Sequence, residues 1–245
     1  MQFITDKRLD DDLREREFQL GEIPGILWTS ASMTAPAPLI LVSPPPLGLR
    51  KAYPRLLDRA RHTVAAGFAT ATIELPWSGD RPRSAAADQA LADLRQALAA
   101  GGPVDEEIID RLILPLVDQA VPEWQTTLDA LLAQPEIGGP VGYSGGVISI
   151  ATRLAAIDPR ITAAVLFAGS FVPLTIVEQA RQVTIPLHVL LQWDDEGNDR
   201  QRSLDLFDAF GSKEKTLHAN MGGHTGVPHY AGAEANRFFT RHLTR

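Results

Sequence analysis

The residues best suited to chemistry lie in the segment G-Y-S-G-G, where Ser144 stands between Gly142 and Gly146. Glycines at these two places let a strand and a helix approach closely around a strained turn, which pushes the serine hydroxyl out of the fold. The bare pattern also occurs by chance in glycine-rich loops. Here an apolar strand precedes it and an apolar helix follows it within 137–156. This context favours a nucleophilic serine whose developing oxyanion faces a helix N-terminus.

A candidate acid and a candidate base follow in the second half of the chain. Three consecutive acids stand where a predicted strand over 187–192 ends, namely Asp194, Asp195 and Glu196. His224 follows a Gly-Gly pair in the loop after the last predicted strand. A histidine can take the proton of a serine hydroxyl, and a carboxylate can hold the required tautomer of its ring. Only one of the three acids can face the imidazole, and the other two are expected to point into water.

His224 is preferred over the five other histidines of the chain. His188 lies inside a predicted strand and is expected to be a satisfied core residue. The others lie on predicted helices or flank the same loop without following the glycine pair: His62, His242, His218 and His229. The acids and histidines have no ligand spacing such as H-E-x-x-H, so the sequence predicts no metal and no cofactor.

Composition limits the class of protein. The chain has 245 residues, of which 44% are hydrophobic and 22% charged, and this suits a single α/β domain over 1–245. The net charge of -7 argues against nucleic acid or an anionic membrane as partner. The absence of cysteine excludes disulfides, thiolate metal sites and a cysteine nucleophile. The charged N-terminus is no secretory segment and no stretch has about 18 apolar residues, so we expect a soluble, cytoplasmic protein.

Apolar strands alternate with helical segments, which predicts a mostly parallel sheet. The range 18–30 is typical of an antiparallel strand pair at the sheet edge, and residues 1–15 are expected to be mobile or a loosely held helix. Further strands are predicted at 38–42, 69–75, 161–170 and 187–192, and helices at 52–66, 174–181 and 232–242.

A long helical region separates the two halves of the predicted sheet. Its glycines and prolines predict three helices, broken at Gly101–Pro103 and near Pro115 or Pro122. Residues 84–120 then form either a helical insertion, such as a small cap over the site, or helices that simply pack on the sheet.

The order serine, acid, histidine is characteristic of one known fold. From about Phe18 onward the chain resembles the α/β-hydrolase fold family, of the bacterial serine esterase or dienelactone-hydrolase-like kind. The segments GYSGG, LLQWDDE, NMGGHTGVP and ELPWSGDRP carry the resemblance. It implies a mostly parallel central sheet of about eight strands, with helices on both faces and room for a small helical cap.

The resemblance also implies a role for each residue. Ser144 would be the nucleophile and His224 its general base. The family pattern favours Asp195 as the acid, with Asp194 as the alternative. Gly145 and Leu47 would supply the oxyanion N–H groups.

The loop that should carry the second oxyanion donor departs from the family pattern. It reads Ser43, Pro44, Pro45, Pro46, Leu47, Gly48, and proline has no N–H to donate. The second donor must therefore come from Leu47 or Gly48, or be absent. A lost donor costs about 3 kcal/mol of transition-state stabilisation.

The predicted activity is hydrolysis of a carboxylic ester, thioester or lactone through an acyl-enzyme. Tyr143, Trp193 and Trp77 are candidates for contact with this small-molecule substrate, and each is equally suited to the core or the rim. Two alternatives remain open: acyl transfer, lyase or cyclase chemistry on the same fold, and a non-catalytic ligand-binding protein. A homo-oligomer also remains open.

Overall fold

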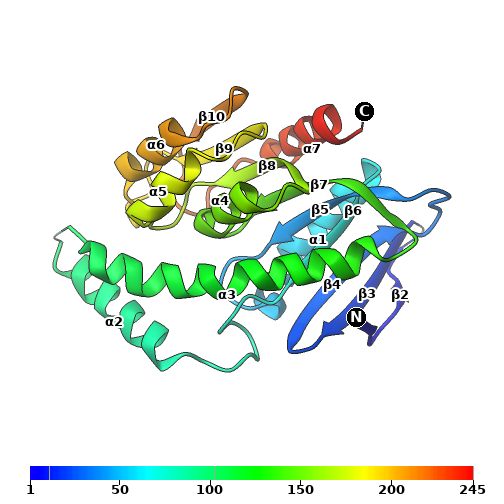
Figure 1. The fold of residues 1–245 in the computed structure, drawn as a ribbon, viewed down its shortest axis with the longest axis horizontal. Helices are drawn as coiled ribbons and strands as arrows, with labels where there is room; N and C mark the ends of the chain where they lie inside the picture. The colour runs from blue at the N-terminus through cyan, green and yellow to red at the C-terminus, as the bar shows by residue number, and fades with distance from the viewer. Residues whose placement is uncertain (11, 102, 245) are drawn as a thin grey trace.

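The computed structural model describes residues 1–10, 12–101 and 103–244, in which one mixed sheet forms the centre of the molecule (Figure 1). The sheet has ten strands in the order β1-β3-β4-β6-β5-β7-β8-β9-β10, with β2 paired to β3. The strands are β1 (Gln2–Phe3), β2 (Lys7–Arg8), β3 (Leu13–Leu20), β4 (Ile23–Ser30), β5 (Ala37–Ser43), β6 (Ala69–Ile73), β7 (Ile137–Gly145), β8 (Ile161–Phe167), β9 (Leu187–Gln192) and β10 (Lys215–Asn220).

Seven helices lie in the described residues and cover both faces of the sheet. Helices α1 and α7 pack together on one face, while α3, α4 and α5 cover the other. Helix α2 packs on α3, and α6 packs on α5. The helices are α1 (Leu49–Ala65), α2 (Ala85–Ala99), α3 (Glu106–Leu132), α4 (Ile148–Ile157), α5 (Leu174–Ala180), α6 (Arg200–Ala209) and α7 (Tyr230–Leu243).

The predicted parallel sheet is confirmed. All pairings from β6 through β5, β7, β8 and β9 to β10 are parallel, whereas β3, β4 and β6 pair antiparallel. Every residue of β6 and β9 is buried, because helices cover both faces there. The sheet has ten strands where about eight were predicted, because the short strands β1 and β2 pair with β3. Within the described ranges every helix is too short or too polar to span a lipid bilayer.

The N-terminal prediction of a mobile segment or loose helix was wrong. Gln2 and Phe3 pair with Gln19 and Phe18 of β3, and β2 pairs with β3 nearer its start. The charged side chains of this segment lie at an exposed part of the sheet edge, where Arg14 Nε donates to Asp6 Oδ1 at 2.8 Å. Charged side chains are compatible with an edge strand because its outer face remains in water.

The predicted break within the long helical region was also wrong. Helix α3 continues through Pro115 and Pro122, although each proline removes one backbone hydrogen bond. One face of this helix is buried in the core, including Trp124 at 0% exposure, so tertiary packing outweighs the local penalty. The predicted break at 101–103 does separate α2 from α3, with Gly101 at φ 70°; Gly102 lies outside the described residues.

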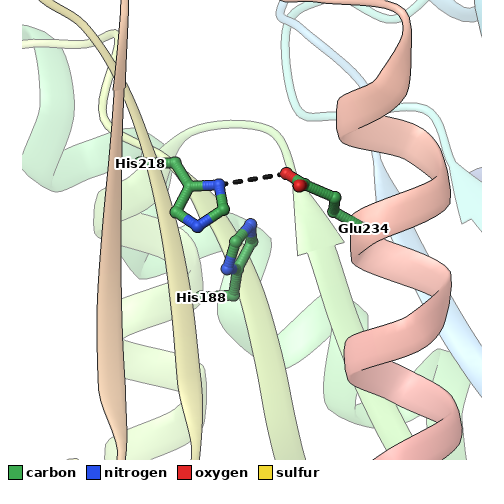
Figure 2. A group of neighbouring side chains, drawn as sticks. All are labelled: His188, His218 and Glu234. Carbon is green, nitrogen blue, oxygen red and sulfur yellow. Dashed lines mark hydrogen bonds and ion pairs between the residues drawn. The ribbon is translucent and has the colours of Figure 1, made fainter.

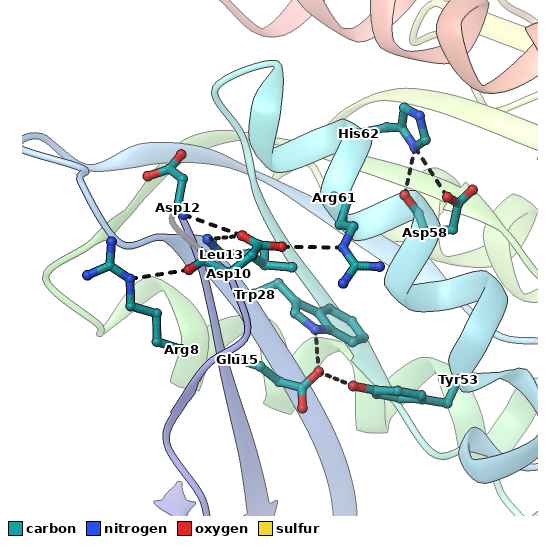
Figure 3. A network of polar contacts seen from close by, with 10 residues as sticks. All are labelled: Arg8, Asp10, Asp12, Leu13, Glu15, Trp28, Tyr53, Asp58, Arg61 and His62. Atoms are coloured by element: carbon teal, nitrogen blue, oxygen red, sulfur yellow. Dashed lines mark hydrogen bonds and ion pairs between the residues drawn. The ribbon is translucent and has the colours of Figure 1, made fainter.

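A buried carboxylate ties the antiparallel edge of the sheet to α1 (Figure 3). Glu15 on β3 is 2% exposed, and its Oε2 accepts hydrogen bonds from Trp28 Nε1 at 2.7 Å and from the Tyr53 hydroxyl at 2.8 Å. Burial and the Glu15 carboxylate raise the pKa of Tyr53 to about 12. The phenol therefore keeps its proton and remains a donor at neutral pH.

Replacing Tyr53 with Phe should destabilise the fold. The change removes one donor from a buried carboxylate, and we expect the free energy of unfolding in urea to fall by about 1.5 kcal/mol. Tyr230→Phe is the matched control, because Tyr230 is 57% exposed and its hydroxyl contacts Asn220 at the surface. Equal losses in the two variants would contradict a stabilising role for the Glu15 contact.

Candidate active site

The parallel strands bring the predicted site residues to one edge of the sheet. β7, β8, β9 and β10 are consecutive neighbours, so their carboxyl ends meet at the same edge. Ser144 lies near the end of β7, Asp195 follows β9, and His224 follows β10.

Ser144 is buried at the end of its strand. It pairs with Val42 on β5 and Val165 on β8, and it is 2% exposed. Among the described non-glycine residues, positive φ occurs only at Trp77, so Ser144 is not strained in this way. The positive φ values at the turn belong to Gly145 (76°) and Gly146 (68°).

Arg59 holds the Ser144 hydroxyl. Its Nη2 donates to Ser144 Oγ at 2.5 Å, and its Nη1 lies 2.8 Å from the place that a Cβ on Gly145 would take. Burial lowers the pKa of Arg59. No carboxylate pairs with Arg59 among the described residues, so a cation without a counter-ion lies beside the serine. Sequence reasoning missed Arg59 because nothing in its local pattern separates it from the other arginines of α1.

Asp195 and His224 form a directed pair. Asp195 Oδ2 lies 2.7 Å from His224 Nδ1, and Asp195 Oδ1 accepts from the Gly197 N–H at 3.1 Å. Asp195 is 8% exposed, while the His224 side chain is 56% exposed and lies edge-on to Phe167. With Nδ1 bound to the carboxylate, Nε2 of His224 is the nitrogen able to accept a proton.

Asp194 has a different partner. Its carboxylate accepts from the N–H groups of Gly222, at 2.9 and 3.0 Å, and of Gly223, at 2.9 Å. The hydrogen bond from the Gly223 N–H, and next that from the Gly222 N–H, lower the pKa of Asp194. The two adjacent acids therefore have different partners. Asp195 contacts the imidazole of His224, and Asp194 binds the two glycines that precede this histidine.

No hydrogen bond joins Ser144 and His224 within the described part of the chain. The Ser144 oxygen instead accepts from Arg59. An open hollow of about 610 Å³ lies at the imidazole, lined by Asp194, Asp195, Glu196, Gly197, Gly223 and His224. Glu196 and Gly197 also line a neighbouring hollow of about 250 Å³, walled by Leu98, Val104 and Ile109. Residues of α2, α3 and their connection therefore border the site, although α3 itself packs on the sheet.

The loop before α1 offers little toward an oxyanion. The Leu47 N–H donates to the Pro45 carbonyl at 2.7 Å, and the Leu47 side chain is exposed. The Leu49 N–H is bound to the Glu74 carboxylate. In this conformation the predicted donor Leu47 is therefore engaged within its own loop.

The three predicted substrate contacts lie in different places. Tyr143 is 1% exposed and packs edge-on against Trp124 in the core, so we do not assign it to the substrate. Trp193 is 42% exposed and stacks under the Arg200 guanidinium at 4.4 Å. Trp77 is partly buried against the core and has φ 61°, a conformation that a bulky residue adopts only when its surroundings hold it there.

The residues of this site do not form a metal-ligand group. Within the described ranges one group of histidines and acids has ligand atoms close enough to hold an ion, and it lies apart from the serine, at His188, His218 and Glu234. The sequence pattern predicted no metal site, because these ligands come from separate elements.

The Asp194 carboxylate should hold the loop in front of His224. We expect Asp194→Ala to speed amide hydrogen exchange at Gly222 and Gly223 roughly threefold or more at pH 7, because both N–H groups lose their acceptor. Since the folded pKa is lowered, the wild-type contact should persist below the ordinary aspartate pKa and be lost as pH falls through the folded value. NMR measures both effects. Asp208→Ala, on the exposed face of α6, is the control, and unchanged exchange in Asp194→Ala would refute the anchor.

Several solved structures with the same architecture are described as esterases or hydrolases. No protein-family model matches the sequence, and a search of curated proteins gave no significant match. The PEG-bound complex of a cold-adapted esterase from an Arctic intertidal metagenomic library is 27% identical, with a TM-score of 0.76, and the match covers 99% of this chain and 100% of that one. A structure described as zinc bound, with the same esterase description, is 25% identical, has a TM-score of 0.74, and covers the same shares.

A more distant likeness is to a dienelactone hydrolase from Anabaena variabilis. It is 18% identical, with a TM-score of 0.62, and the match covers 95% of this chain and 100% of that one. The strand order, the positions of the candidate residues at the ends of β7, β9 and β10, and these likenesses together show that the chain has the α/β-hydrolase fold.

Proposed function

We propose that this protein is a serine hydrolase that cleaves a carboxylic ester, thioester or lactone through an acyl-enzyme. The observation that carries the proposal is the 2.7 Å contact of Asp195 with His224, at the sheet edge where Ser144 lies near the end of β7. Ester hydrolysis in general is also supported by the esterases among the structural neighbours.

The contact between Asp195 and His224 determines which nitrogen of His224 would transfer the proton in this reaction. Asp195 holds Nδ1 of His224, so Nε2 takes the proton of the Ser144 hydroxyl as Oγ attacks the carbonyl carbon. The tetrahedral intermediate then collapses, the bond to the leaving oxygen or sulfur breaks, and His224 returns the proton to that atom. Water, activated by the same nitrogen, attacks the acyl-serine, releases the acid and restores the hydroxyl.

Attack requires Ser144 and His224 to come into contact. The Ser144 oxygen accepts from Arg59, so its own proton remains available to Nε2. His224 is 56% exposed on a loop over an open hollow, and the proposal requires this loop to carry the ring toward Ser144. Loop closure that completes a catalytic arrangement is common among enzymes.

We assign charge stabilisation in the transition state to Gly145 and Arg59. The Gly145 N–H follows the nucleophile, and the guanidinium lies against this glycine. Arg59 is partly buried, so less water screens its charge than at the open surface, and this strengthens its action on an oxyanion. In this proposal Arg59 takes the place of a donor from Leu47, whose N–H is engaged within its own loop.

The surroundings favour an uncharged substrate. Asp194, Asp195 and Glu196 line the hollow at the imidazole, and their negative charge would repel a carboxylate. The exposed Trp193, which directly precedes Asp194, offers an apolar contact. We therefore propose a neutral small-molecule ester, with neither nucleic acid nor membrane as partner.

Ser144→Ala should abolish both turnover and labelling. We expect hydrolysis of p-nitrophenyl acetate to fall by roughly 10³-fold or more, and intact mass spectrometry to show a single fluorophosphonate adduct on the wild type and none on this variant. Ser149→Ala is the matched control, since Ser149 is buried on the following helix and lies outside the proposed machinery.

The other outcomes separate the alternatives. Labelling of Ser144 without hydrolysis would favour acyl transfer or lyase chemistry. Absence of an adduct on the wild type would refute the proposal and favour a ligand-binding protein.

Arg59→Met tests the assignment of the guanidinium. If Arg59 stabilises the oxyanion, kcat should fall roughly 10²-fold with KM little changed. Arg55→Met, on the exposed face of the same helix, is the control. An unchanged or higher kcat in Arg59→Met would show that the arginine only restrains the serine.

A further inference from the structure

Two histidines and one carboxylate meet on the face of the sheet that α7 covers (Figure 2). They are His188 on β9, His218 on β10 and Glu234 on α7, and their candidate ligand atoms all lie within 4.8 Å of one another. The rings of the two histidines lie edge to face with centroids 4.4 Å apart. None of the three belongs to the machinery proposed for ester hydrolysis.

His188 has a buried nitrogen without a partner. The residue is 5% exposed, and its Nδ1 lies 2.9 Å from the Thr216 hydroxyl, while its Nε2 has no hydrogen-bond partner. The end of this ring that is farther from the backbone points toward the space between His218 and Glu234. A buried polar atom without a partner is uncommon and calls for an explanation.

The tautomer that satisfies Thr216 leaves Nε2 able to bind a cation. When Nδ1–H donates to the Thr216 oxygen, Nε2 carries a lone pair and no proton. Such a hydrogen bond on the far nitrogen is what orients a metal-bound histidine in proteins.

His218 and Glu234 complete the set. Nδ1 of His218 lies 3.0 Å from Glu234 Oε2, and Glu234 Oε1 is 3.7 Å from Arg237 on the same helix. Their side chains are 40% and 25% exposed, so an ion and its water can enter from solvent. Two imidazoles and one carboxylate are a ligand set that zinc takes in proteins, with a fourth position left to water.

We propose that His188, His218 and Glu234 form a zinc site, with Nε2 of His188, Nδ1 of His218 and a carboxylate oxygen of Glu234 as ligands. The ion would give the unpartnered Nε2 a partner and replace the hydrogen bond between His218 and Glu234. It would also join β10 to α7, the two elements that hold the ends of the loop carrying His224. Zinc should therefore make the loop between them harder to open.

Direct binding of the metal tests this proposal without reference to activity. Untagged protein, freed of metal with a chelator, is titrated with Zn²⁺ by calorimetry and with Co²⁺ by visible absorption. We expect one ion per chain, tetrahedral cobalt bands, and a melting temperature several degrees higher with zinc. His218→Ala and Glu234→Gln should weaken zinc binding roughly 10-fold or more, because each removes one of three ligands.

The variants are chosen so that failure to fold is not mistaken for loss of the site. His218 and Glu234 are partly exposed, so their replacement should leave the metal-free melting temperature nearly unchanged. His188 is not replaced, because it is buried and its loss would disturb the core. His62→Ala, on the exposed face of α1, is the control and should bind zinc as the wild type does. No saturable binding by the wild type, or equal binding by all variants, would overturn the proposal.

Discussion

Parallel pairing from β5 to β10 is the constraint on which the rest of the structure depends. Parallel strands need a crossover between them, so helices cover both faces and the strands themselves must be apolar. The same pairing places the carboxyl ends of β7, β9 and β10 at one edge. Residues separated by about 80 positions in the chain thus share one site because each follows a strand of the same sheet.

The nucleophile and the base of the proposed site differ in burial. Ser144 is enclosed and its hydroxyl is bound by a cation, while His224 lies on an exposed loop and is directed by one carboxylate. Partial burial of a guanidinium without a carboxylate partner costs free energy, and such a charge interacts favourably with any negative charge that develops beside it. An oxyanion formed at Ser144 would be such a negative charge, and this links the position of Arg59 to the chemistry that we propose.

The loop that carries His224 is held from several directions. Asp194 binds its glycines, Asp195 binds the imidazole, and His218 and Glu234 lie on the elements at its two ends. The proposed catalysis and the proposed zinc site thus use the same two strands, β9 and β10. A hydrolase with a mobile base would need such anchors, because the ring must return to one position at each turnover.

Local patterns in the sequence determined the fold and the approximate site. Apolar runs gave β5 and β9 nearly to the residue, and the glycines around Ser144 placed the turn, because these signals act over a few neighbouring residues. The place of His224 after β10 followed from chain order and a family resemblance.

Tertiary structure alone decided the contacts between distant segments. Only packing keeps α3 continuous through two prolines, and only strand pairing orders the first eight residues. The choice between Asp194 and Asp195 as the partner of His224, the approach of Arg59 to Ser144, and the meeting of His188, His218 and Glu234 each depend on side chains from separate elements. No spacing along the chain encodes such distances, since they are set by how the sheet and its helices pack.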